Sequence, residues 1–465
     1  MNPFKKLISN TFIIGLGTIG SKMLVFLLMP LYTAWLTTAE YGTAELITTT
    51  ANLLIPVACL GLANGVFRFA AEKGSDHAAV FSSSITLLGL GTLGFLVLSP
   101  LLLLVDFVSE YFILIVLYVL FANLQSVCAH YVRATDDTKL FAIQGILNTA
   151  LTVLFNVLFL AVWNLGVIGY VLSVILGNLF TVFFLVWQAK LWRVVRPSAV
   201  RKSILKELLI FSLPLVPTTV CWLITDLSDR YMVTYFHGAG VNGIYSAAYK
   251  VPTLVNLVSG IFMQAWQFSA VAESSDEGTA RVFYSKVLKG FLSVVFIGSA
   301  GLVLLTPVLT KLLLNRSYHG AVEFMPTLLC AVALEALVSF LATVYMVRKM
   351  SMHSFLTAIV GSILNIVLNF VLIPSMGPLG AAIATMASYG AVLILRLLDV
   401  HRIMPFCMHL PRMVINIALL LGAAAVMTFV GEWRMLWTLP FVVAMVAINT
   451  PALISTAKAI FSERK

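Results

Sequence analysis

The stretch Gly166–Gln188 reads GVIGYVLSVILGNLFTVFFLVWQ and holds no charged residue across 23 positions. A run of this length can cross the hydrocarbon core of a bilayer as an α-helix, because each helical residue adds about 1.5 Å. Similar apolar runs follow one another from Thr11 to about Ser455. Mean hydropathy is +1.01, and only 10% of the 465 residues are charged. These features predict a polytopic membrane protein without a separate soluble catalytic domain.

The hydropathy pattern predicts about fourteen membrane helices in an all-α fold. Helices are expected because the backbone in lipid must satisfy its own hydrogen bonds. The predicted spans are residues 11–36, 44–69, 80–104, 111–132, 140–163, 166–188, 208–228, 243–270, 288–313, 324–346, 354–373, 379–398, 412–430 and 436–455. Five prolines are expected to break or kink these helices: Pro30, Pro56, Pro214, Pro217 and Pro252.

The distribution of basic residues predicts the orientation. With the N-terminus in the cytoplasm, 23 of the 29 lysines and arginines fall on the inner side of the membrane and five on the outer side. This bias is typical of cytoplasmic loops and predicts that both termini are cytoplasmic. It also explains the net charge of +10 better than nucleic-acid binding does. The five cysteines are far apart and form no CxxC pair, so we expect packing roles and no metal site.

The two halves of the sequence resemble each other. The first half carries Gly145, Asn148, Asn156, Gly166 and Gly169, and the second carries Gly361, Asn365, Asn369, Gly377 and Gly380 at offsets of 211 to 217 residues. Duplicated six-helix halves predict two pseudo-symmetric lobes around a central cavity; chance similarity between apolar segments is the alternative. The predicted organisation is an N-terminal lobe (residues 1–189), a basic cytoplasmic linker (190–207), a C-terminal lobe (208–402), and two additional helices with a cytoplasmic tail (403–465).

Short motifs in the first, second, seventh, eighth and eleventh predicted helices carry a family resemblance. They are Gly20-Ser21-Lys22, Pro30-Leu31-Tyr32-Thr33, Glu40-Tyr41-Gly42, Leu60-Gly61-Leu62, Arg68-Phe69, Ser212-Leu213-Pro214-Leu215-Val216-Pro217, Asp229-Arg230-Tyr231, Gly243-Ile244-Tyr245-Ser246, Asn365-Ile366-Val367-Leu368-Asn369 and Gly377-Pro378-Leu379-Gly380. As a set they resemble the polysaccharide-export, O-antigen-type branch of the multidrug/oligosaccharidyl-lipid/polysaccharide (MOP) flippase superfamily. The likeness covers the twelve-helix body.

The resemblance implies a MATE-like fold and a transporter rather than an enzyme. The expected function is alternating-access transfer of a polyprenyl-pyrophosphate-linked oligosaccharide to the outer leaflet, with O-antigen, capsule, exopolysaccharide or teichuronic-type precursors as cargo. It implies a bacterial cytoplasmic membrane, no cofactor, and coupling to a proton or sodium gradient. Expected partners are the lipid-linked oligosaccharide, membrane lipid, a polysaccharide polymerase and glycosyltransferases, and no nucleic acid.

Ionisable residues within the predicted spans are the candidate site residues, because charge is costly in the bilayer. We expect Lys22, Arg68, Lys250 and Glu45 to face the cavity and bind cargo, with pairing of Lys22 to Glu45 and lipid anchoring of Arg68 as alternatives. A guanidinium suits phosphate oxygens, and an anionic cargo needs a basic cavity.

Four further charged residues are structural or coupling candidates, namely Asp226, Asp229, Arg230 and Glu335. Asp229 and Arg230 are expected to form a local ion pair, and Glu45 and Glu335 could carry a proton. Arg133 and Arg396 near inner helix ends are expected to anchor the chain in the headgroup region. No catalytic or metal-binding residues are expected.

Two motifs are rejected, and other functions stay open. The GxGxxG match at Gly15–Gly20 lies inside a predicted membrane helix, without the preceding strand of a nucleotide site. Asp136-Asp137 is expected to cap a helix; a membrane transferase acting on polyprenyl phosphate would instead use the pair to hold metal. The runner-up is an ion-coupled multidrug antiporter of the same superfamily, and a peptidoglycan-precursor flippase is a third possibility.

Overall fold

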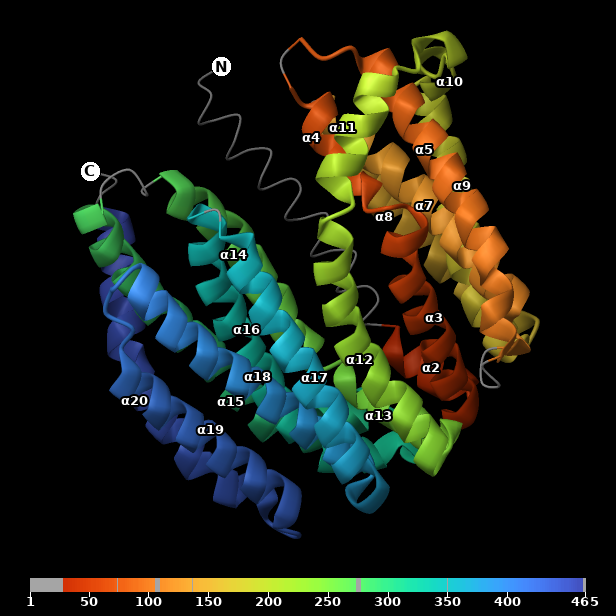
Figure 1. Cartoon of the computed structure of the whole chain (residues 1–465). Helices are drawn as coiled ribbons and strands as arrows, with labels where there is room; N and C mark the ends of the chain where they lie inside the picture. The colour runs from red at the N-terminus through yellow and green to blue at the C-terminus, as the bar shows by residue number, and fades with distance from the viewer. Residues whose placement is uncertain are drawn as a thin grey trace. The chain divides into compact units, whose positions relative to one another are not determined.

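A computed structural model describes residues 28–462, apart from residues 73, 105–108, 136, 273–276 and 349. A few side chains within helices, that of Asp226 among them, also lie outside the described part. Every regular element that it describes is a helix (Figure 1). The chain forms two compact units, Met1–Leu227 (unit 1) and Ser228–Lys465 (unit 2). The domain limits expected from the sequence stay a prediction.

Unit 1 contains the first set of helices. In chain order they are α2 (Met29–Trp35), α3 (Thr38–Ala58), α4 (Leu62–Ala70), α5 (His77–Leu98), the 3-10 helix η1 (Ser99–Leu104), α7 (Phe112–Ala134), α8 (Thr138–Asn156), the π-helical η2 (Val157–Val162), α9 (Gly166–Gln188), α10 (Leu191–Val194), the 3-10 helix η3 (Pro197–Ala199) and α11 (Lys202–Ser212). Helix α9 packs against α3, α7 and α8, and α4 packs against α5, α7 and α11.

Helix α12 begins in unit 1, and the remaining helices belong to unit 2. They are α12 (Leu215–His237), α13 (Ala239–Tyr249), α14 (Thr253–Ala272), α15 (Glu277–Leu313), the 3-10 helix η5 (Arg316–Glu323), α16 (Met325–Val347), α17 (Ser351–Met376), α18 (Pro378–Ile403), α19 (Leu410–Phe429) and α20 (Arg434–Ser462). Helix α16 is the centre of unit 2. It packs against α14, α15, α18 and α19, and 83% of its most apolar 18-residue stretch is buried. Small residues such as those in Cys330–Ala333 let neighbouring backbones approach it.

Ten helical segments of the described chain are long and apolar enough to cross a membrane. They coincide with ten of the fourteen predicted spans, from residues 77–104 to residues 434–454. The predicted span 11–36 begins outside the described residues. The other three predicted spans, 44–69, 208–228 and 243–270, are each divided into two helices. The protein is therefore an all-helical, multi-pass membrane protein in which three spans are interrupted.

Proline and left-handed backbone account for the interruptions. Pro214 follows the end of α11, and Pro252 precedes α14, so both breaks occur where proline was expected to act. Helix α3 contains Pro56 and ends at Ala58, after which Leu60 and Gly61 have φ values of 53° and 68°. Proline removes a backbone donor, and a left-handed residue ends the helical path.

The two breaks of unit 1 lie next to each other. A Cβ atom placed on Gly61 would be 2.7 Å from the carbonyl oxygen of Ser212 and 3.2 Å from Val216. Glycine is needed at this point for two reasons, since its φ is positive and the backbone of the α11–α12 break touches it. This contact packs the break between α3 and α4 against the break between α11 and α12.

Candidate functional site

Unit 1 buries a carboxylate on α3. Thr37 and Glu40 form a capping box that fixes the start of this helix, and Glu45 follows on its buried face. Glu45 is 4% exposed. Its Oε1 accepts hydrogen bonds from the hydroxyls of Tyr41 (3.2 Å) on α3 and Tyr170 (3.0 Å) on α9. These donors offset the cost of burying the charge, which would otherwise be high.

A second polar contact extends this cluster to α2 and α8. The ring of Tyr170 packs edge to face on Tyr32, with centroids 5.1 Å apart. Asn156 on α8 donates from Nδ2 to the Tyr32 hydroxyl at 3.1 Å. The Oδ1 of Asn156 is buried and accepts no hydrogen bond from the described residues.

Unit 2 also buries a carboxylate among helices. Asp229 on α12 is 2% exposed. Its Oδ2 accepts from the Tyr245 hydroxyl on α13 at 2.9 Å and from the Thr385 hydroxyl on α18 at 2.7 Å. Its Oδ1 accepts from Nδ2 of Asn369 on α17. The Asn369 amide also donates to Asn365 at 2.9 Å. One acid thus joins four helices of unit 2.

Each of the two clusters contains an asparagine from an echoed position of the sequence repeat. Asn369, like Asn156, has a buried Oδ1 without a hydrogen-bond partner among the described residues. These two asparagines are the echoed positions of α8 and α17. The sequence selected Glu45 and Asp229 as charges, but it did not identify Tyr41, Tyr170 or Thr385 as their partners. The duplicated asparagines were the sequence feature that could have pointed to these clusters, because each lies in the cluster of its unit.

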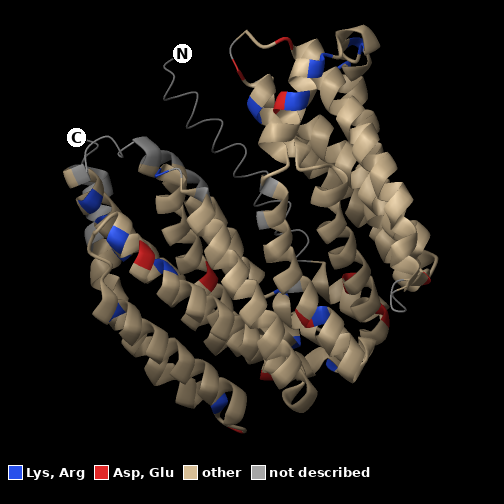
Figure 2. Cartoon of the chain, viewed as in Figure 1, with Lys and Arg blue, Asp and Glu red and all other residues tan. Residues whose placement is uncertain are grey.

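Arginines of unit 1 stack on aromatic rings. The guanidinium of Arg68, at the end of α4, lies 4.7 Å from the ring centre of Phe211 on α11. That of Arg133, on α7, lies 4.7 Å from the ring of Phe67. Arg68 is exposed and Arg133 is half-buried. Lysines and arginines gather where α4, α10 and α11 lie in unit 1 (Figure 2). Stacking fixes the plane of a guanidinium and leaves its edge able to donate.

The remaining candidate residues occupy several different places in the chain. Lys22 lies outside the described residues, as does the side chain of Asp226. Lys250 is half-buried at the end of α13. Arg230 lies with its guanidinium 5.9 Å from the ring centre of Tyr249, and its expected ion pair with Asp229 stays a prediction.

Glu335 and Asp137 have local partners. Glu335 on α16 is half-buried and accepts from the amide of Asn256 on α14 at 3.2 Å. Asp137 caps α8, because its carboxylate accepts from the backbone N–H of Leu140 at 3.0 Å. This confirms the capping role expected for Asp137, while Asp136 lies outside the described residues. Within the described ranges no three His, Cys, Asp or Glu residues lie close enough to hold a metal ion.

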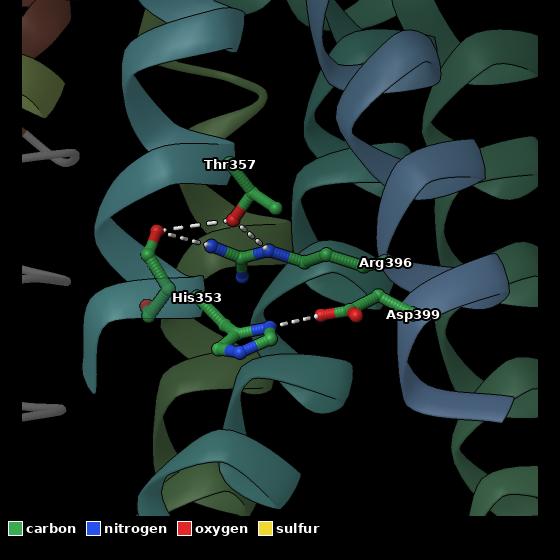
Figure 3. A network of polar contacts seen from close by, with 5 residues as sticks. His353, Thr357, Arg396 and Asp399 are labelled. Atoms are coloured by element: carbon green, nitrogen blue, oxygen red, sulfur yellow. Dashed lines mark hydrogen bonds and ion pairs between the residues drawn. The ribbon is translucent and has the colours of Figure 1, made fainter. Parts of the chain in front are cut away.

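Arg396 corrects one expectation, since it is not an exposed lipid anchor. It is 2% exposed and lies between α16, α17 and α18. Its guanidinium donates to the Thr357 hydroxyl at 3.0 Å and to the Val338 carbonyl at 2.8 Å. Figure 3 shows it beside a hydrogen-bonded pair, in which His353 Nδ1 and Asp399 Oδ2 are 2.8 Å apart. Neutral oxygens inside unit 2, rather than lipid headgroups, solvate this arginine.

The sequence matches a known family over more than half of its length. Residues 7–267 match the family described as "Polysaccharide biosynthesis protein". The chain belongs to this family. A comparison with curated proteins finds no match.

Solved structures similar to this chain include a flippase and transporters of the MOP superfamily. The lipid II flippase MurJ in an inward closed conformation is 15% identical, with a TM-score of 0.72, over 97% of this chain and 99% of that one. An inward-facing multidrug resistance MATE family transporter is 13% identical, with a TM-score of 0.71, over 83% and 98%. A MOP superfamily transporter from Pyrococcus furiosus Vc1 is 15% identical, with a TM-score of 0.62, over 86% and 96%. This polysaccharide biosynthesis family member therefore has the MOP superfamily fold.

Proposed function

We propose that the protein is a flippase for a polyprenyl-pyrophosphate-linked oligosaccharide in cell-surface polysaccharide synthesis. It would carry this lipid from the cytoplasmic to the outer leaflet of a bacterial inner membrane by alternating access. The observation that carries the proposal is the match to the polysaccharide biosynthesis family, in a chain built of membrane helices. A polymerase and glycosyltransferases would be its partners.

The stacked arginines of unit 1 support an anionic cargo. Arg68 is exposed and its ring contact with Phe211 holds the guanidinium plane. A fixed, planar group of this kind can donate two parallel hydrogen bonds to a pyrophosphate. Arg68 would receive the cargo from the cytoplasmic leaflet, and Lys22 and Lys250 would provide further positive charge. A lipid-anchoring role for Arg68 is the alternative.

The buried acids support ion coupling. Glu45 and Asp229 each hold hydrogen bonds from more than one helix, and each cluster contains an asparagine oxygen without a partner among the described residues. A proton or sodium ion that enters such a cluster would change which helices the acid holds together. We infer one coupling site in each unit, at Glu45 and at Asp229.

The interrupted helices support movement within unit 1. Helix breaks bend more readily than continuous helices, and transporters place them near their moving parts. The α3–α4 and α11–α12 breaks touch at Gly61 and Ser212. Movement at one break would therefore be transmitted to the other.

Lipid analysis of a strain that lacks the protein tests the proposal. We expect one polyprenyl-pyrophosphate oligosaccharide to accumulate, to be detected by mass spectrometry, and to be cleared by re-expression. A strain that makes such a polymer yet shows an unchanged lipid pool, also after removal of a second flippase of the same fold, would contradict the proposal.

A multidrug antiporter is the second candidate, favoured by the fold it shares with MATE transporters. It predicts increased drug susceptibility in the deletion strain without accumulation of a lipid intermediate. A membrane transferase predicts instead that replacing Asp136 and Asp137 abolishes function. A flippase would tolerate Asp137→Asn, because asparagine also caps helices.

A further inference from the structure

Unit 2 contains a basic cavity that is separate from the buried carboxylate of Asp229. It lies where α15 begins, and the segment between α18 and α19 passes along it. Its volume is about 600 Å³. Basic side chains from two parts of the chain line it, namely Arg281, Lys286 and Lys289 of α15 with His401 and His409. The positive charge of the cavity comes from the three α15 residues, and the histidines add polar groups from a distant part of the sequence.

Lys286 and Lys289 supply positive charge to this cavity that no described acid pairs with. No aspartate or glutamate is among the residues that line it in the described chain. Lys286 is exposed and Lys289 is half-buried, and neither side chain makes an ion pair within the described ranges. Close positive charges repel each other at the low dielectric of a membrane interface. A bound anion would relieve this repulsion.

Hydrogen bonds hold the wall of the cavity in place. The backbone N–H of Cys407 donates to the Ser285 hydroxyl at 2.9 Å. The His409 Nε2 lies 3.1 Å from the Ser285 carbonyl oxygen, so Nε2 carries the proton that it donates. His409 is also the N-cap residue of α19, and its side chain makes no cap hydrogen bond. The positive end of the α19 dipole thus lies at the cavity and adds to its attraction for anions.

Apolar residues complete the lining. Val282, Pro405 and Phe406 line the same cavity, and the membrane helices α15 and α19 extend from it. A free phosphate ion would gain nothing from these groups, whereas the glycerol and first acyl carbons of a lipid would bury apolar area against them. Basic pockets beside cytoplasmic helix ends are suited to anionic headgroups.

We propose that this cavity binds the phosphate headgroup of an anionic phospholipid from the cytoplasmic leaflet. Lys286 and Lys289 contact the phosphate, and the α19 N-terminus faces it. The exposed Val282 and Pro405 contact the glycerol region. The site is distinct from the cargo path proposed above, because it requires neither Arg68 nor the Glu45 cluster.

Lipid binding to the full-length, detergent-solubilised protein tests this site. The probes are short-chain phosphatidylglycerol, phosphatidylcholine with the same chains, and inorganic phosphate, measured by native mass spectrometry. The test variant is Lys286→Gln/Lys289→Gln. The control variant is Lys311→Gln/Arg316→Gln. It removes two exposed cations, one in the last turn of α15 and one just beyond the end of this helix. Lys286→Arg/Lys289→Arg retains the charge and should restore binding.

We expect the protein to prefer phosphatidylglycerol over phosphatidylcholine. Each interfacial cation changes binding of an anionic lipid about fivefold, so the loss of two cations should weaken phosphatidylglycerol binding about twenty-five-fold. The control variant should bind it like the original protein. Equal phosphatidylglycerol binding by the test variant, or equal binding of the two lipids, would overturn the proposal. Binding of inorganic phosphate as tight as that of phosphatidylglycerol would overturn the lipid assignment in favour of a free phosphate site.

Discussion

Glu45 is the residue whose replacement tests the proposed coupling mechanism most directly. Its carboxylate accepts hydrogen bonds from Tyr41 and Tyr170, which lie on different helices. A proton on Glu45 would remove the charge that both hydroxyls solvate and would weaken the link between α3 and α9. The protonation state of the Glu45 carboxylate would thereby influence how firmly α3 and α9 are held together.

Replacement of Glu45 by glutamine should abolish coupling while preserving the fold. Glutamine keeps an oxygen acceptor for the tyrosine hydroxyls but cannot change charge. One charge moved through about 100 mV is worth about 2.3 kcal/mol, so we expect transport to fall by about tenfold or more. Complementation of the deletion strain at matched protein abundance measures this. Glu72→Gln, at an exposed site, is the control and should leave transport unchanged. Normal transport by Glu45→Gln would remove Glu45 from the mechanism.

His409 should give the protein a measurable acid sensitivity. Burial, with the nearby cations Lys289 and Arg412, lowers the pKa of His409, while the hydrogen bond to Ser285 opposes the shift. The unfolded chain then binds a proton that the folded chain does not. The stabilisation is therefore complete above about pH 6.5 and is lost as the pH falls towards the folded pKa.

The variant His409→Asn isolates this effect, because asparagine tolerates the φ of +49° at this position. Thermal unfolding in an uncharged detergent should show a steeper loss of stability on acidification for the original protein than for the variant. Parallel pH profiles for the two proteins would show that His409 does not titrate in this way.

Sequence reasoning at the residue scale selected Glu45 and Asp229 as candidate site residues, which stays a prediction, and it did not identify the residues around them. Glu45 and Asp229 stand out because a charged residue is rare in an apolar stretch. Their tyrosine and threonine partners are common in membrane helices, so no local pattern selects them. Arg396 was misjudged because position along a helix does not reveal which face is buried.

At the scale of helices, the main feature of unit 1 is that two of its predicted spans are each divided into two helices. Hydropathy treats residues 44–69 and 208–228 as continuous spans, because the breaking residues are few and mostly apolar. Pro214 and Pro252 indicated two of the breaks correctly. The contact between Gly61 and Ser212 could not be predicted, because it depends on the packing of segments about 150 residues apart.

Replacement of Gly61 by alanine should destabilise unit 1. A Cβ there would meet the Ser212 carbonyl oxygen at 2.7 Å, in addition to the strain of a positive φ. Gly74→Ala is a matched control, since Gly74 has a φ of +81° with no atom within 4 Å of the added carbon. We expect Gly61→Ala to cost about 2 kcal/mol more than Gly74→Ala, read from thermal unfolding. Equal losses would mean that only backbone strain matters and that the two breaks are not tightly packed.

At the scale of the whole molecule, the sequence predicts an internal repeat, and this duplication stays a prediction. Of the echoed asparagines, Asn156 donates to Tyr32 in unit 1, whereas Asn369 donates to the acid Asp229 in unit 2. Ten predicted spans coincide with membrane-length helices. The identity of the cargo could not be predicted from the sequence, because composition and periodicity do not identify the side chains that recognise sugars. The chain belongs to the polysaccharide biosynthesis family, and the identity of its cargo is our proposal.

Transbilayer movement in reconstituted vesicles tests the central claim most directly. The purified full-length protein would be placed in liposomes that contain a fluorescent polyprenyl-pyrophosphate oligosaccharide, with a membrane-impermeant quencher outside. Under an imposed ion gradient we predict that the quenchable fraction changes in vesicles with the protein and stays constant in protein-free vesicles or with Lys22→Ala. A quenchable fraction that matches protein-free vesicles under both proton and sodium gradients, for protein shown to be folded, would contradict the account.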